Sequence, residues 1–137
     1  MRLLLGTCAL VALAEREPMR DQAIAALRAA QAAGTIFVPA VITLEIAQKT
    51  AAGKFTLAGG RSARDWFEAA LVAARFRHLP VTADLALAAY ELPEPFHKGP
   101  ADRLIVAMAR RLKASVVTID RRIVAYGQRG HVQVLAY

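Results

Sequence analysis

The segment Met1-Arg2-Leu3-Leu4-Leu5-Gly6-Thr7-Cys8, residues 1–8, contains the clearest signal for a buried strand in the chain. Leu3-Leu4-Leu5 is a short, continuous apolar run, and Gly6-Thr7 offers a stop followed by a helix cap. A run in which every residue is apolar, rather than every second one, is typical of a strand buried on both faces. The segment therefore predicts a buried central strand followed by a helix.

Beyond this segment, short apolar runs alternate with stretches of helical spacing. Strands are predicted at 36–38, 77–81, 115–118 and 132–135, and helices at 19–33, 42–52, 62–76, 83–91, 100–112 and 121–126. The alternation predicts an α/β fold with a mostly parallel sheet covered on both faces. With 137 residues, the chain 1–137 is predicted to form a single domain.

The composition excludes some classes of protein and favours one kind of partner. The chain is 56% hydrophobic and 21% charged, so it is neither a disordered tail nor a charged helical rod. Its one cysteine excludes an internal disulfide and a cysteine-rich zinc site. Residues 97–137 hold eight basic and two acidic side chains, and therefore most of the net charge of +7. Such an excess attracts polyanions, above all nucleic acid.

Residues 2–14 have the outline of a secretory signal peptide, with one positive charge before an apolar run. Gly6-Thr7-Cys8 interrupts that run, and its removal would delete the predicted central strand. No apolar run approaches the ~20 residues of a membrane span. We therefore expect a cytoplasmic protein with no membrane partner.

Three carboxylates fall where the parallel strands end. Glu45 lies one turn into the helix after the second strand, Asp102 begins the helix behind a loop rich in proline, and Asp120 follows the fourth strand. Ligands of parallel sheets bind beyond the carboxyl ends of the strands. Converging acids repel one another unless a cation joins them, and oxygen ligands select Mg²⁺ or Mn²⁺. Such an ion can activate water and hold a phosphate.

Five blocks of sequence carry a family resemblance. They are Met1–Leu5, Thr43–Lys49 followed by Gly53-Lys54, Leu79–Thr82, His97–Ala107 and Val116–Asp120. Together, and in this order, they resemble the PIN domain family and, within it, the VapC toxins. The resemblance implies a three-layer α/β/α sandwich around a five-stranded parallel sheet. It also implies a Mg²⁺- or Mn²⁺-dependent endoribonuclease with a VapB-type antitoxin, RNA and a second copy of the chain as partners.

The resemblance also exposes a departure at position 6. Family members end the first strand with an aspartate that is a principal metal ligand, usually in an Asp-Thr-His run, whereas this chain has Gly6-Thr7-Cys8. The block that commonly reads Asp-Pro-Phe-Asp-Arg is here Gly99-Pro100-Ala101-Asp102-Arg103. We expect weaker ion binding and, on the order of 10²-fold or more, weaker activity.

Glu45, Asp102 and Asp120 are therefore the predicted catalytic and metal-binding residues, and Thr7 and Thr118 are predicted to orient a carboxylate. Basic residues near the acidic positions are predicted to bind the RNA backbone: Lys98, Arg103, Arg121 and Arg122. Each site residue also has an ordinary interpretation. Glu45 fits a solvated helix, Asp102 a first helical turn, and Asp120 a helix cap.

Residues outside these blocks have simpler interpretations. Cys8 fits a small buried side chain, and His78, His97 and His131 lack metal-ligand spacing. A further set is predicted to lie in the core: Leu27, Trp66, Phe67, Leu71 and Val72.

Two functions from different classes remain. The first is a VapC-like, metal-dependent endoribonuclease weakened at Gly6. The second is a catalytically inactive PIN-fold binding module that captures an antitoxin or RNA. A phospho-receiver domain is disfavoured, because the acidic pair near the first strand is missing.

Overall fold

A computed structural model describes all 137 residues as an α/β/α sandwich. The strands are β1 (Leu3–Leu5), β2 (Ile36–Pro39), β3 (Arg77–Leu79), β4 (Ser115–Val117) and β5 (Gln133–Leu135). The helices are α1 (Thr7–Ala14), α2 (Asp21–Ala33), α3 (Ala40–Ala51), α4 (Ala63–Ala74), α5 (Ala83–Ala88), α6 (Pro100–Leu112) and α7 (Arg121–Gln128), with a 3₁₀ turn at Ala58–Gly60.

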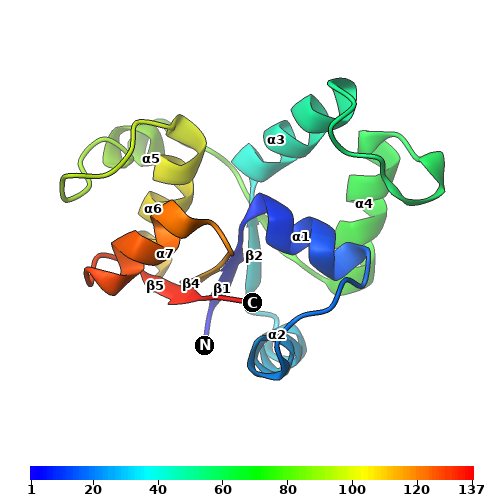
Figure 1. Ribbon diagram of the computed structural model, residues 1–137, viewed down its shortest axis with the longest axis horizontal. Helices are drawn as coiled ribbons and strands as arrows, with labels where there is room; N and C mark the ends of the chain where they lie inside the picture. The colour runs from blue at the N-terminus through cyan, green and yellow to red at the C-terminus, as the bar shows by residue number, and fades with distance from the viewer.

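All five strands are parallel, in the order β3-β2-β1-β4-β5. The predicted central position of residues 3–5 is thereby confirmed, since β1 pairs with β2 on one side and β4 on the other. Right-handed crossovers place helices on both faces of such a sheet. Figure 1 shows α5, α6 and α7 to one side of the strands and α1 and α4 to the other.

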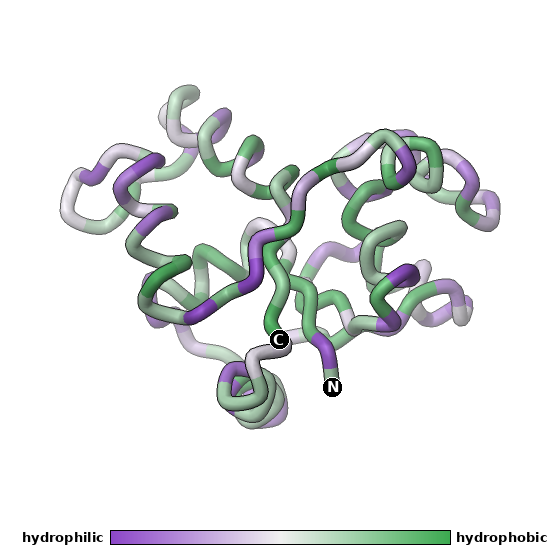
Figure 2. Tube along the Cα trace, turned by 180° about the vertical axis from the view of Figure 1, so that it is seen from behind, coloured by the Kyte–Doolittle hydropathy of each residue, from purple (hydrophilic) through white to green (hydrophobic).

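The core lies where the sheet meets the helices. Leu3, Leu4 and Leu5 are fully buried, and the core runs from them through β2 and β4 into α6. Burial of each leucine side chain stabilises the folded state by about 1.5–3 kcal/mol, so β1 contributes a large share of the hydrophobic free energy of folding. Figure 2 shows apolar residues along the central strands and polar residues on outward-facing turns.

Local signals set several helix ends. Ser62 and Thr82 accept hydrogen bonds from the backbone N–H groups of Asp65 and Leu85, as N-caps do. Gly34 ends α2 in the left-handed conformation, with φ 68°. The N-cap of α1 is Gly6, and Thr7 is the first helical residue rather than the cap.

The structure corrects three smaller expectations. The helix expected from residue 19 begins at Asp21. Val72 is 81% exposed because it lies on the outer face of α4, whereas Trp66 and Phe67 of the same helix are buried. Cys8 is exposed rather than buried, because it lies on the outer side of the first turn of α1.

None of the helices combines the length and the apolar character that a membrane crossing needs.

Candidate active site at the carboxyl edge of the sheet

Gly6 lies at the carboxyl end of the central strand, beside the end of β4. Its N–H donates to the carbonyl of Val117 at 3.1 Å. A Cβ atom at position 6 would lie 3.3 Å from that carbonyl oxygen and 3.7 Å from Thr118 Oγ1. A side chain at position 6 would therefore point toward the loop that carries Asp120.

Asp120 caps α7, as its ordinary interpretation predicts. Its Oδ1 accepts from the N–H groups of Arg122 at 2.8 Å and Ile123 at 3.2 Å. Its own N–H donates to Thr118 Oγ1 at 3.0 Å. Thr118 is buried, and it positions Asp120 through the backbone rather than through the carboxylate.

Asp102 lies in the first turn of α6, close enough to Asp120 to feel its charge. Burial raises the pKa of Asp102 above its ordinary value, and the negative charge of Asp120 raises it further. His97 and Arg122 oppose this shift. Asp102 Oδ2 lies 2.8 Å from His97 Nε2, and both side chains are largely buried.

Glu45 has a different environment. It lies on α3, half-buried, with Oε2 4.0 Å from Lys49 Nζ one turn along the same helix. No three Asp, Glu, His or Cys side chains are arranged so that they could hold a metal ion. The structure thus brings Asp102 and Asp120 together but does not assemble the predicted set of three acids.

The model of the PIN domain family matches residues 3–128. The chain belongs to the PIN domain family. No curated protein sequence matches it.

Two solved structures are similar to the chain in fold. One is VapBC2 from Rickettsia felis bound to a DNA fragment from their promoter, with a TM-score of 0.71 and 18% identity, covering 100% of this chain and 99% of that one. The other is FitAcB from Neisseria gonorrhoeae, with a TM-score of 0.65 and 19% identity, covering 97% and 96%. At such identities the likeness establishes the fold.

This PIN domain does not fit a divalent ion as its side chains lie. The end of the central strand supplies no side-chain oxygen because residue 6 is glycine. Asp120 uses one carboxylate oxygen to cap α7, and Asp102 faces His97. Thr7 is buried and its Oγ1 has no hydrogen-bond partner, so the predicted contact with a carboxylate is not formed.

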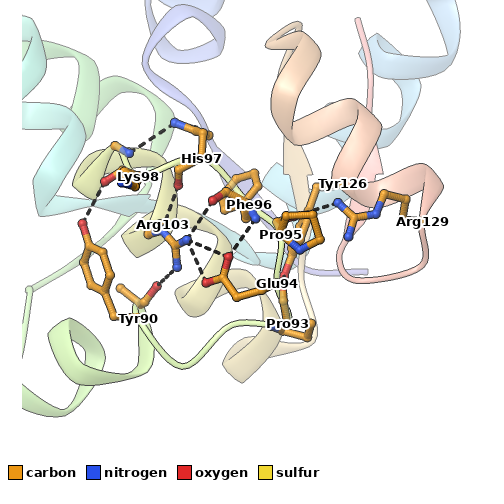
Figure 3. Close-up of polar contacts among 12 residues, drawn as sticks. Tyr90, Pro93, Glu94, Pro95, Phe96, His97, Lys98, Arg103, Tyr126 and Arg129 are labelled. Atoms are coloured by element: carbon orange, nitrogen blue, oxygen red, sulfur yellow. Dashed lines mark hydrogen bonds and ion pairs between the residues drawn. The ribbon is translucent and has the colours of Figure 1, made fainter.

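Arg103 is not part of an RNA surface. The side chain is 3% exposed, and its guanidinium donates to the carbonyls of Ala89, Phe96 and His97. It also pairs with Glu94 at 2.9 Å (Figure 3). The prediction that Arg103 binds RNA is therefore withdrawn, because the group that would contact a phosphate is buried and occupied.

The loop before α6 is held from several sides, as Figure 3 shows. The hydroxyl of Tyr126 donates to the carbonyl of Pro93 at 2.6 Å, and Arg129 donates to that of Pro95 at 2.8 Å. Tyr90 donates to the carbonyl of Lys98 at 2.9 Å. Together with Arg103, these bonds fix the segment that presents His97 to Asp102.

Basic residues that are close in sequence to Asp102 and Asp120 lie in two separate places. Lys98, Arg121 and Arg122 are exposed around the acidic edge, by which we mean the carboxyl edge of the sheet where Asp102 and Asp120 lie. Arg110 and Lys113 lie at the other end of α6, where they line a hollow of about 920 Å³ between α6, α7, β4 and β5. Closeness in sequence to Asp102 and Asp120 therefore does not mean closeness in space.

Proposed function

We propose that this PIN domain is a VapC-type member of a toxin–antitoxin pair, which binds RNA but cleaves it only weakly. Its partner would be a VapB-type antitoxin. The proposal is supported by membership of the PIN domain family and by the similarity in fold to proteins solved as VapBC2 and FitAcB.

Gly6 is the observation that carries the proposal of weak cleavage. It ends the most buried strand, at the position from which a side chain would point toward Thr118 and the Asp120 loop. Two nearby carboxylates remain, and each already has a partner within the protein. In the family the missing group is an acid, so this edge has lost one negative charge where a cation would need it.

RNA binding rests on charge at the same edge. Lys98, Arg121 and Arg122 are exposed, and no carboxylate within ion-pair distance neutralises them. Cations on an open surface bind phosphates without reading the bases. We therefore expect affinity for single-stranded RNA with little preference for sequence.

The test compares RNA cleavage, in Mg²⁺ or Mn²⁺, by the chain as it stands and by Gly6→Asp. A Cβ at position 6 would lie 3.3 Å from the Val117 carbonyl oxygen, a tight contact that requires a shift of a few tenths of an ångström, and no other atom lies closer than 3.7 Å. We expect the Gly6→Asp rate to rise on the order of 10²-fold. Gly6→Asn is the matched control, since it adds nearly the same volume without the charge, and we expect no gain from it.

A second variant, Asp102→Ala, tests whether the unaltered chain already cleaves RNA at this site. Fast cleavage by the unaltered chain that disappears in Asp102→Ala would contradict the proposal, because it would mean that the site works without an acid at position 6. If the unaltered chain and Asp102→Ala both cleave slowly while RNA binding is intact, the proposal of weak cleavage stands.

A second candidate function is a binding module without catalysis, favoured by the lack of any three-residue metal group. It predicts that Gly6→Asp stays inactive while the chain still forms a complex with a VapB-type antitoxin. Co-expression followed by size-exclusion chromatography with light scattering measures that complex. The same measurement reports whether the chain is a homodimer.

A further inference from the structure

His97 lies against the acidic edge and faces Asp102. Its Nε2 atom is 2.8 Å from Asp102 Oδ2. That atom is shielded from solvent and makes no hydrogen bond in the structure. The ring packs edge-on against Phe96, with 4.7 Å between the ring centres. Asp102 is thus the polar group that the Nε2 side of the imidazole approaches, although no hydrogen bond joins them.

The other ring nitrogen shows which one carries the proton. The N–H of Gly99 donates to His97 Nδ1 at 3.2 Å, and Arg122 Nη1 lies 3.4 Å from the same atom. Both partners are donors, so Nδ1 acts as an acceptor and is unprotonated. In the neutral ring the proton is then on Nε2, which faces the carboxylate of Asp102.

Gly99 leaves the room that the ring occupies. Its φ of −60° and ψ of 120° suit any residue, so the backbone does not require glycine. A Cβ at position 99, however, would lie 2.8 Å from His97 Cε1 and 3.1 Å from Nδ1. Any side chain at position 99 would therefore push the imidazole out of its present place.

We propose that His97 closes the acidic edge: the Nε2 side of its ring occupies the place beside Asp102 Oδ2 that a divalent ion would take, so that an ion reaches Asp102 only when the ring has moved away. The closure deepens the proposed function by naming what competes with the ion. It is tested without RNA, so it can fail while the proposed function stands.

The experiment measures Mn²⁺ binding by the loss of the free-ion electron paramagnetic resonance signal. It uses the full chain as Gly6→Asp, in which an acid is present, and adds either Gly99→Ala or His97→Ala. Because the His97 ring lies beside the Asp102 oxygen that the ion would use, we expect each second change to tighten Mn²⁺ binding on the order of tenfold. His131→Ala in the same background is the control and should leave the affinity unchanged.

Gly99→Ala is the decisive variant, because it keeps every charged and polar side chain and adds one methyl group. If His97 were itself a ligand of the ion, both second changes would weaken binding, and that result would overturn the proposal. Unchanged affinity, or no Mn²⁺ binding in any variant, would also overturn it. If His97→Ala fails to fold by circular dichroism, Gly99→Ala alone decides between these outcomes.

A second readout follows the ring directly. Long-range ¹H–¹⁵N spectra of the unaltered chain should show His97 protonated at Nε2 alone. In Gly99→Ala this pattern should change toward that of a solvated histidine. An identical pattern in both proteins would mean that the ring has not moved, and would contradict the closure.

Discussion

Arg103 shows how one buried cation shapes a site that it does not touch. Its three carbonyl partners and Glu94 hold the loop that presents His97. Replacement by methionine leaves these carbonyl acceptors without their donor, and a buried acceptor left unsatisfied costs about 1–3 kcal/mol. Chemical denaturation of Arg103→Met should show that loss. Arg121→Met, at an exposed position, should change stability by about 0.5 kcal/mol or less, and equal losses would contradict the role of Arg103.

Asp102 illustrates the opposite case, a residue whose charge the fold disfavours. Since its pKa is raised, the folded state binds the proton more tightly than the unfolded chain. The free energy of unfolding therefore falls as the pH rises from the ordinary aspartate pKa through the raised pKa of Asp102 in the folded state. This loss of stability is complete at neutral pH. Asp102→Asn should raise the melting temperature at pH 7 and have little effect at about pH 3, below the ordinary aspartate pKa. An equal rise in melting temperature at both pH values would contradict a raised pKa for Asp102.

At the scale of elements, α7 packs unusually close to β5. A Cβ at Gly127 would lie 2.7 Å from Val134 Cγ2 and 3.1 Å from the carbonyl oxygen of Val132. Alanine is the better helix former by about 1 kcal/mol, but overpacking costs typically 1–3 kcal/mol. We expect Gly127→Ala to lower the unfolding free energy by roughly 1 kcal/mol, because the backbone carbonyl of Val132 cannot rotate away from the added methyl group as a side chain could. Gln128→Ala is the exposed control, and a more stable Gly127→Ala would show that the helix can shift.

The strands and helices were easier to predict from the sequence than the contacts of the site residues. Each strand was found within a few residues, because continuous apolar runs between turn signals are a local property. The position of Gly6 followed from the central strand and the family pattern. Arg103 was misjudged, and the contact of His97 with Asp102 was not predicted, since both are placed by a loop whose path depends on contacts with α5 and α7. One signal was available: Arg103 lies three and four residues before the buried Val106 and Ala107, on an inward face of α6.

At the scale of the whole molecule, two sets of basic residues in the last third of the chain lie apart from each other. Helix α6 spans 13 residues, or about 20 Å, and it separates Lys98 at the acidic edge from Arg110 and Lys113 at the far end. An RNA strand bound at the acidic edge would have to extend about 20 Å along α6 to contact the second set. Total charge predicts that RNA binds, but only the fold predicts where.

Two paired variants test this division by the salt dependence of RNA binding. Each phosphate contact with a single strand contributes about 0.7 to the slope of log K against log salt. Arg121→Ala/Arg122→Ala should weaken binding of a short single-stranded RNA and reduce that slope by about 1.4. Arg110→Ala/Lys113→Ala removes the same charge from the far end and should leave the slope nearly unchanged. Fluorescence anisotropy over a range of salt concentrations measures both. Equal reductions would show that net charge alone, rather than its location, governs binding, and would remove the reason to assign RNA to the acidic edge.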